Sequence, residues 1–421
     1  MIKQEHNEAR PPLSWKVLFA YWFAQYAAWV ALLTPVIITS ALQIRRIVGE
    51  EAKAEWLGII LGIGAAAAMI AAPIWGALSD RTTARMGRRK PWIIAGAVSL
   101  LVGLSVMGMA KSPIIFGLGW LICQIGSNAA QAAFNAVISD IVPESQHGLV
   151  SALLGASTTA GMVTGVFLTQ FTNGSPLAMF LVPWMLSPVA VALFVWIVPD
   201  APAQLASMPR LRLRNIFTSI GIASLRHWDF FLAFVSRFLV MFGAAFSMTY
   251  QVYYLTDHLR IPAAEVAQFM VLSTSMMGAL TFAVSCFGGW LSDKVGRRKP
   301  FVGGAAAVMA CGLFMVSQAT TFNEFLLGAG LASIGQGLYH AVDIALCVEV
   351  LPDRDFAARD MAVLQIASSL PQSLAPTVAP LLLAIAIGGM ASGANYPLLF
   401  LFAGTAALIG ALAIVPIRKV R

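Results

Sequence analysis

Long apolar stretches follow one another along almost the whole chain, and most run for about 20 residues or more, the length that a helix needs to cross a bilayer. Hydrophobic residues make up 59% of the 421 residues, and charged residues only 11%. A water-soluble domain carries about 25% charged residues. Because lipid offers the backbone no hydrogen-bond partner, and no alternating strand pattern suggests a barrel, the spans must be helices. The sequence therefore predicts an all-α membrane protein that crosses the bilayer many times.

The hydropathy pattern predicts twelve transmembrane helices. Their expected ranges are 14–42, 55–79, 91–110, 113–140, 149–171, 177–198, 229–254, 264–290, 300–318, 323–350, 361–388 and 396–416. Most Lys and Arg residues outside the spans then lie on the side of the N-terminus, which by the positive-inside rule is the cytoplasm. We expect a multi-pass protein of the plasma membrane, here the bacterial inner membrane, with both termini cytoplasmic. This topology accounts for the net charge of +8, so no nucleic acid partner is expected.

The two halves of the chain repeat the same motifs. The letters GALSD at 76–80 and GRRKP at 87–91 recur as GWLSD at 289–293 and GRRKP at 296–300. Such a repeat in a membrane protein indicates two homologous bundles with a binding site between them. We therefore predict an N-terminal six-helix bundle over 1–198, a cytoplasmic linker over 199–228 and a C-terminal six-helix bundle over 229–421.

With these motifs the chain resembles the major facilitator superfamily over essentially its whole length. It shares two sets of six spans and the loop G-x-L-x-D-(R/K)-x-G-R-R, which follows the second and the eighth span. The resemblance implies the major facilitator fold, alternating access, and a gate in which loop residues and their partners hold the halves together on the cytoplasmic side. The gate residues would be Asp80, Arg81, Arg88, Asp140, Asp293, Arg297 and Glu349. The basic members could instead serve only to orient the protein in the membrane.

A finer resemblance lies in the first loop and the first span. The first loop has six residues between Asp80 and Gly87 where the second has two, and the first span carries Gln25 and the letters LLTP at 32–35. These features are similar to sucrose-type transporters and to glycoside–pentoside–hexuronide cation symporters, and they imply a sugar or glycoside as the substrate. Melibiose-like members of the second group bind their cation with acidic residues in spans two and four. Span two here has none beyond Glu55 at its outer rim, so sodium coupling of that kind is not expected.

Two predicted spans carry polar side chains at intervals of three or four, which place them on one helical face. Span four has Gln124, Asn128, Gln131 and Asn135, and span ten has Ser333, Gln336, His340 and Asp343. A polar face inside a membrane must look at protein or water, so the two stripes predict a central aqueous cavity. Hydrogen bonds between packed helices are the alternative. The substrate-binding candidates are Gln25, Trp29, Gln124, Asn128, Gln131, Gln336 and His340.

Arg237 and Asp343 are the costliest residues of the predicted spans, because each places a charge within the membrane. We expect an ion pair between spans seven and ten that neutralises both. His340 lies one turn from Asp343 and could share or relay a proton near neutral pH. The trio is a candidate for proton coupling or substrate binding, and a purely structural salt bridge is the alternative.

No metal-ligand cluster, nucleotide-binding loop or nucleophile constellation stands out in the sequence, so we expect no enzyme activity, no catalytic residue, no metal and no cofactor. The predicted function is secondary active transport of a small solute, a sugar or glycoside, by alternating access with proton symport. The alternative is a proton-coupled efflux antiporter for apolar or cationic compounds. The expected partners are a small-molecule substrate, protons and the lipid bilayer, and we expect a monomer.

Overall fold

The computed structural model describes residues 12–172, 174–203, 222–262, 264–295, 297–351, 357–385 and 394–418, which form helices and the connections between them. The first half contains α1 (Trp15–Thr34), the π-helical turn η1 (Pro35–Thr39), α2 (Ser40–Asp80), α3 (Lys90–Met109), α4 (Pro113–Ile141), α5 (His147–Thr169), α6 (Pro176–Trp184) and α7 (Leu186–Ile197). The second half contains α9 (Trp228–Tyr253), the π-helical turn η6 (Tyr254–His258), α10 (Val266–Val295), α11 (Arg298–Gln318), α12 (Phe322–Glu349), α13 (Ala357–Leu383) and α14 (Tyr396–Ile414). Short 3-10 turns lie at Glu144–Gln146, Gln170–Thr172 and Ile222–Arg226. The predicted all-α fold is confirmed.

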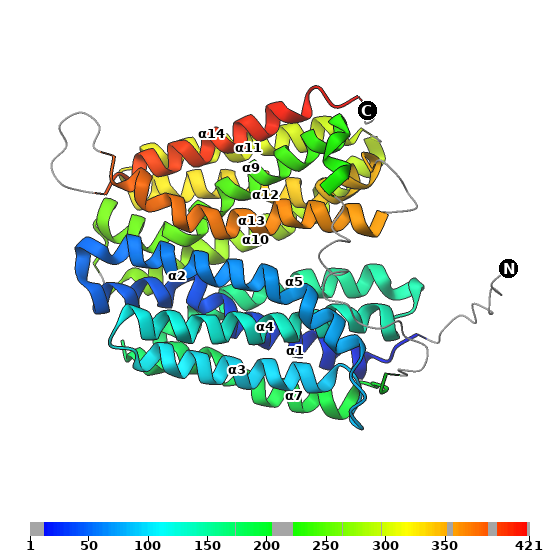
Figure 1. Cartoon of the computed structure of the whole chain (residues 1–421). Helices are drawn as coiled ribbons and strands as arrows, with labels where there is room; N and C mark the ends of the chain where they lie inside the picture. Colours follow the sequence, from blue (N-terminus) through cyan, green and yellow to red (C-terminus); the bar gives the residue numbers. More distant parts are fainter. Residues whose placement is uncertain are drawn as a thin grey trace.

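The helices form two bundles that lie side by side, α1 to α7 in one and α9 to α14 in the other (Figure 1). We call the end of the molecule that carries residues 81–89 the basic end, where α1 also begins and α14 ends. The opposite end, where α2 bends, is the far end. Residues 204–221 of the predicted linker lie outside the described residues, so the domain boundaries stay a prediction.

Within the part of the chain that the structure describes, eleven helical stretches are long and apolar enough to cross a membrane, one fewer than the twelve predicted. The difference lies at the first two spans, because Trp15–Asp80 runs on as one bent stretch. It passes through η1 and then bends at Gly49, whose φ of 78° is not helical. Glycine adopts this left-handed region without the clash that a Cβ would cause. The predicted spans 14–42 and 55–79 are the two arms on either side of this bend.

The predicted span 177–198 consists of two helices, α6 and α7, which are separated at Met185. Pro188, near the start of α7, explains the interruption. Proline has no N–H, so Pro188 cannot donate to the carbonyl group of Trp184 four residues earlier. The two pieces together still form one apolar stretch, Pro176–Ile197, of 22 residues.

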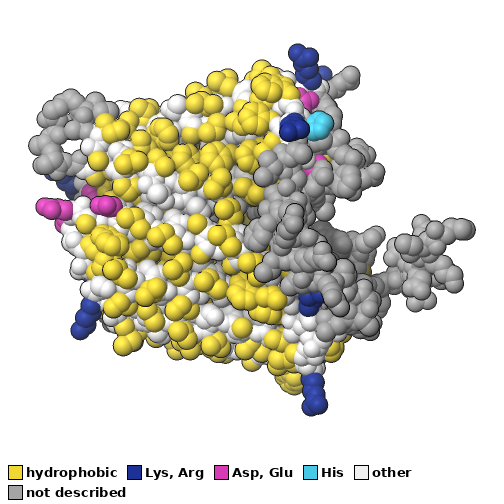
Figure 2. Space-filling model, in the orientation of Figure 1, with side chains coloured by type: hydrophobic (Ala, Val, Ile, Leu, Met, Phe, Trp, Pro, Cys, Tyr) yellow, Lys and Arg dark blue, Asp and Glu magenta, His cyan; other side chains and the backbone are white. Residues whose placement is uncertain are grey.

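The outer surface is apolar over the middle of the molecule and charged at its two ends. Figure 2 shows hydrophobic side chains over the body of both bundles, and Lys, Arg, Asp and Glu near the ends. The exposed Trp15, Trp196 and Trp228 lie at helix ends on the basic side, and tryptophan favours the membrane–water interface. Most of the apolar surface is therefore of the kind that faces lipid.

The two bundles approach each other most closely where α2 packs on α13 and α5 packs on α10. A Cβ built on Gly58 of α2 would lie 2.2 Å from the carbonyl oxygen of Pro376 in α13. A Cβ built on Gly278 of α10 would lie 3.0 Å from the methyl carbon of Thr159 in α5. Small residues permit this close approach of helices in a membrane. Gly58 lies toward the far end of α2, so the bundles meet tightly there.

Candidate functional site

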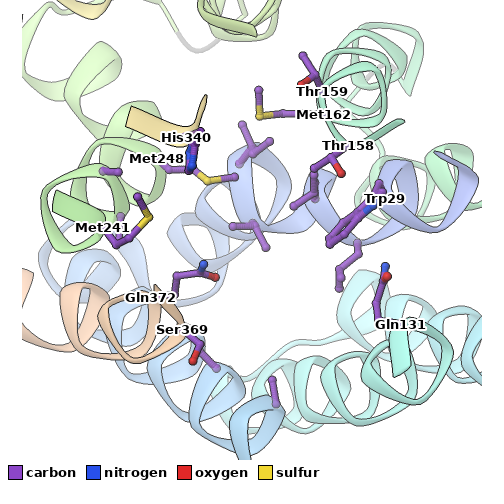
Figure 3. A pocket seen from close by; sticks show the side chains of 18 of the residues that line it. Trp29, Gln131, Thr158, Thr159, Met162, Met241, Met248, His340, Ser369 and Gln372 are labelled. Atoms are coloured by element: carbon purple, nitrogen blue, oxygen red, sulfur yellow. The ribbon is translucent and has the colours of Figure 1, made fainter. Parts of the chain in front are cut away.

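A large cavity lies between the two bundles. Its volume is about 1950 Å³, and residues of α1, α2, α4, α5, α9, α10, α11, α12 and α13 line it (Figure 3). On α2 the lining runs from Leu61 to Asp80, which is the last residue of this helix and lies at the basic end. The cavity therefore extends to the basic end and stops short of the far end.

The seven predicted substrate-binding candidates all line this cavity. They are Gln25, Trp29, Gln124, Asn128, Gln131, Gln336 and His340. Asn135 and Ser333 line it as well, so most of both predicted polar stripes faces the space between the bundles rather than lipid. Figure 3 shows Trp29 and Gln131 on one side of the space, with His340 and Gln372 across from them.

Gln25, Trp29 and Gln131 form one polar corner of the cavity, which we call the amide corner. Gln25 Nε2 donates a hydrogen bond of 2.9 Å to Gln131 Oε1. The buried Oε1 of Gln25 and Nε1 of Trp29 have no hydrogen-bond partner among the described residues. Because an unpaired buried polar atom costs free energy, the amide corner keeps a hydrogen-bonding capacity that a ligand or water can use.

Methionines line much of the rest of the cavity. They are Met69, Met162, Met241, Met248, Met277 and Met309. Figure 3 shows the side chains of Met162, Met241 and Met248 around the same space as Trp29. Methionine is flexible and polarizable, so such a wall can adapt to apolar ligands of different shapes. The apolar residues of a span do not reveal by themselves which of them face lipid and which face a cavity.

The cavity carries few charged groups. Among the described residues that line it, Asp80 is the one carboxylate, and His340 is the one imidazole. Asp80 lies at the basic end and forms an ion pair of 2.7 Å with Arg89. The deep part of the cavity therefore offers no carboxylate to a cationic ligand.

Arg237 and Asp343 form a buried ion pair beside the cavity. Arg237 Nη1 lies 2.6 Å from Asp343 Oδ2, and the two side chains are 12% and 6% exposed. Arg237 Nε also donates to Ser368 Oγ at 2.5 Å. Neither charged residue is among those that line the cavity. Asp343 thus departs from the predicted stripe, because its carboxylate turns toward the guanidinium of α9, while His340 one turn earlier faces the cavity.

The first basic loop contributes to a charged cluster at the basic end, made of Asp80, Arg88, Arg89 and Asp140. Arg88 Nη2 lies 2.6 Å from Asp140 Oδ1. Arg89 Nε lies 2.8 Å from Asp140 Oδ2, and Arg89 Nη1 lies 2.7 Å from Asp80 Oδ1. Burial by itself lowers the pKa of the Arg89 guanidinium, but hydrogen bonds to Asp140 and Asp80 raise the pKa above its usual value, so the group stays charged. The resemblance implied contacts between the halves, whereas these ion pairs all join residues of the first bundle.

Asp200, at the start of the predicted linker, adds an acceptor that the sequence interpretation missed. Its carboxylate accepts hydrogen bonds from the backbone N–H groups of Arg89 at 2.7 Å and Lys90 at 2.9 Å. A carboxylate at this position satisfies free N–H groups and complements the dipole of α3. Gly87, with φ of 111°, lets the loop approach, because a Cβ there would lie 2.1 Å from the Asp200 carboxylate.

The second basic loop has a smaller counterpart. Glu349 pairs with Arg298 at 3.0 Å, whereas the prediction named Arg297. Arg297 is an exposed residue in extended conformation before α11, and Arg298 is the first residue of that helix, which holds its side chain beside Glu349. Asp293 lies in α10, and its side chain is outside the described part of the structure. Arg81 follows α2, and its N–H caps the end of that helix.

Replacing Arg89 with Met is expected to destabilise the protein. The Arg89 side chain is 3% exposed and pairs with two carboxylates, and removing one partner of a buried ion pair costs up to roughly 3–5 kcal/mol. The melting temperature of the purified protein in detergent measures the effect. Arg85→Met changes an exposed residue of the same loop and is the matched control. Equal melting temperatures for the two variants would contradict the prediction.

Comparisons with known proteins agree with this architecture. The curated multi-drug resistance efflux pump PmrA of Streptococcus pneumoniae is 26% identical over 263 residues, which is 61% of this chain and 61% of that protein. The sucrose transport protein SUC4 of Arabidopsis thaliana is 25% identical over 134 residues, 27% of this chain and 26% of that protein. The chain thus spans less than two thirds of the length of these relatives.

The solved structures extend the likeness to the whole fold. A crystal structure of the nucleoside transporter NupG matches with a TM-score of 0.72 at 12% identity, over 95% of this chain and 98% of that one. At this identity the match concerns the fold alone. The family model described as Major Facilitator Superfamily matches residues 17–285 and 230–421. These two matches together cover nearly all of the described helices, and the chain therefore belongs to the Major Facilitator Superfamily, a family of membrane transporters.

Proposed function

We propose that this protein is a secondary transporter that exports neutral, amphipathic compounds in exchange for protons. The observation that carries the proposal is the cavity of about 1950 Å³ with a methionine-rich wall and one polar corner. Pockets for drug-sized ligands measure about 300–1,000 Å³, so compounds of several shapes would fit. The methionines would pack on the apolar body of a compound, and the amide corner would bind its oxygen or nitrogen atoms.

The charge of the cavity favours neutral substrates over cations. A cation that leaves water needs a counter-charge nearby. Asp80 lies at the basic end and is paired with Arg89, and the carboxylate of Asp343 is paired with Arg237 outside the lining. A permanent cation in the deep part of the cavity would therefore lack a partner.

The basic end is proposed to face the cytoplasm, as the positive-inside rule favours for the Arg-rich loop 81–89. The cavity extends to that end, so a compound would enter it from the cytoplasm or from the inner leaflet. The likeness to PmrA, which is named an efflux pump, supports export. The plasma membrane of a bacterium is the proposed location.

Expression in a bacterial strain without its own major efflux pumps tests the proposal. We expect resistance to chloramphenicol, a neutral amphipathic antibiotic, to rise severalfold, and resistance to ethidium, a permanent cation, to stay unchanged. Everted membrane vesicles should accumulate labelled chloramphenicol when a proton gradient is imposed and lose it when an ionophore is added. Resistance to ethidium without resistance to chloramphenicol would contradict the proposed substrate class.

Import of a glycoside is the second candidate, and the amide corner is the observation that favours it. Sugars bind by stacking on an aromatic ring while amides bind their hydroxyl groups, and Trp29, Gln25 and Gln131 lie together in the cavity lining. The likeness to SUC4, named a sucrose transport protein, points the same way. Proton-driven uptake of a labelled disaccharide into cells that express the protein, with no effect on antibiotic resistance, would favour this candidate over export.

A further inference from the structure

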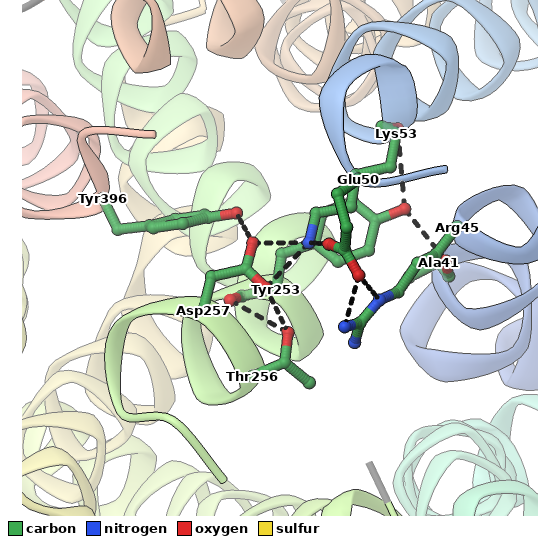
Figure 4. A network of polar contacts seen from close by, with 8 residues as sticks. All are labelled: Ala41, Arg45, Glu50, Lys53, Tyr253, Thr256, Asp257 and Tyr396. Carbon is green, nitrogen blue, oxygen red and sulfur yellow. Dashed lines mark hydrogen bonds and ion pairs between the residues drawn. The ribbon is translucent and has the colours of Figure 1, made fainter. Parts of the chain in front are cut away.

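A group of charged residues joins the two bundles at the far end, and we call it the Lys53 cluster (Arg45, Glu50, Lys53 and Asp257). Lys53 Nζ, on α2, lies 2.7 Å from the carboxylate of Asp257 in η6 and 2.5 Å from Glu50 (Figure 4). Arg45 also pairs with Glu50, at 2.5 Å. The Lys53 side chain is only 6% exposed, although lysine is rarely buried unless it is paired. One buried cation is thus shared by carboxylates from both bundles.

Two tyrosines of α9 reinforce this junction. Tyr253 donates its hydroxyl hydrogen bond to the carbonyl oxygen of Ala41 at 2.9 Å. The Tyr250 hydroxyl lies 2.9 Å from the carbonyl oxygen of Pro376 in its own bundle and 3.2 Å from that of Ala54, so the two acceptors share its proton. Lys53 Nζ also lies 4.9 Å from the centre of the Tyr253 ring, within the range of a cation–π contact. The contacts with Ala41, Ala54 and Lys53 all join α9 of the second bundle to α2 of the first.

The Lys53 cluster lies beyond the closed end of the cavity. In chain order, the cavity lining includes Ile37 of η1 and next Leu61 of α2, so residues 38–60 do not line it. Lys53 lies about two helical turns from Leu61, on the side away from the cavity. We propose that the ion pair between Lys53 and Asp257 holds the far end closed, and that it must break before the cavity can open on that side. This inference rests on the alternating exposure that the proposed transport requires.

The arrangement allows the ion pair to break without isolating either charge. Lys53 and Glu50 both belong to α2, so they can stay together when the bundles separate. Asp257 accepts hydrogen bonds from Tyr396 at 2.6 Å and from Thr256 at 2.7 Å, both in its own bundle. Opening would also expose the pair to water, which solvates both charges. The junction can therefore form and break repeatedly, as a transport cycle demands.

The test measures how fast a reagent added on either side of the membrane reaches a thiol placed in the cavity. Met248 lines the cavity on α9, so Met248→Cys serves as a reporter for a membrane-impermeant, charged methanethiosulfonate. The exposed Cys286 and Cys311 are replaced by Ser, and the buried Cys123 and Cys347 are kept. Right-side-out and everted vesicles present opposite faces of the protein to the reagent. In this background we expect modification from the basic end only.

Lys53→Met and Asp257→Asn should each raise the rate of modification from the far end by about tenfold. The double variant should be no faster than either single one, because both changes remove the same contact. Glu50→Gln is the matched control: it removes a carboxylate from Lys53 within one bundle and keeps the contact between the bundles, so its far-end rate should stay low.

Modification from the basic end at the rate of the parent protein shows that a variant is folded. If Lys53→Met and Asp257→Asn then react from the far end as slowly as Glu50→Gln, the proposal is overturned. Additive effects in the double variant would also overturn it, since they would mean that the two residues act separately. No substrate enters the measurement, so a wrong substrate class would leave its outcome unchanged.

Discussion

Asp343→Asn is expected to abolish transport against a concentration gradient while leaving the downhill exchange of substrate intact. The Asp343 carboxylate is buried within α12 and pairs with Arg237 of α9, whose side chain is 12% exposed. If the pair carries the coupling proton, the amide cannot release or accept it, and coupled transport should fall by at least roughly 100-fold, as for the loss of a positioned acid or base. Proteoliposomes loaded with labelled substrate measure accumulation and exchange separately.

The controls separate coupling from folding. Glu324→Gln changes an exposed carboxylate at the start of the same helix, where glutamine can keep the capping hydrogen bonds, and should leave accumulation unchanged. Arg237→Met leaves Asp343 buried without its partner, at a cost of roughly 3–5 kcal/mol in the free energy of unfolding. The double variant Arg237→Met/Asp343→Asn should regain stability without regaining accumulation. Accumulation that persists in Asp343→Asn would show that this residue does not carry the proton, and His340, which lines the cavity, would become the next residue to test.

Gly58→Ala is expected to force the two bundles apart at the far end. The added methyl group would lie 2.2 Å from the carbonyl oxygen of Pro376 and 3.0 Å from the hydroxyl oxygen of Tyr250. A backbone carbonyl cannot turn aside as a flexible side chain can, so α2 or α13 must shift. Overpacking of this kind costs about 1–3 kcal/mol, and here the cost falls on the conformation that is closed at the far end.

The expected result is a cavity that opens more often toward the far end, together with slower transport. The Met248→Cys reporter should react faster from the far end than in the parent protein. Gly76→Ala, on the same helix, adds a methyl group with nothing within 4 Å of it and is the matched control. If Gly58→Ala and Gly76→Ala react alike from both sides, the packing of α2 on α13 does not set the balance between the two conformations.

The architecture could be predicted from the sequence because two strong signals agree. Lipid demands long apolar helices, and the repeated loops show two related sets of them. The polar stripes of α4 and α12 were also visible, because Gln124, Gln131, Gln336 and His340 recur at helical intervals and a membrane tolerates such faces only against protein or water. Their placement around one cavity follows from the same constraint.

The partners of individual charged side chains could not be predicted, because they depend on how each helix is rotated about its own axis in the folded protein. Asp343 follows the spacing of its stripe, yet it lies beside the cavity because Arg237 draws its carboxylate toward α9. Helical spacing shows which residues share a face, but it does not show whether a side chain points into the cavity or toward a charged partner on another helix. The same holds for Lys53 and Asp257, which are 204 positions apart and meet only in the folded chain. Adjacent arginines such as Arg297 and Arg298 differ only in whether the helix has begun.

The wide turn η6, Tyr254–His258, determines where Asp257 points. A π-helical turn holds one residue more than an α-helical turn, and each residue of a helix advances the side-chain direction by about 100°. Deleting a single residue from this turn would restore regular winding and swing the Asp257 carboxylate away from Lys53 by about that angle. The one additional residue in η6 thus directs the Asp257 carboxylate toward the other bundle. The local geometry of a single helical turn thereby determines whether an ion pair forms between two bundles.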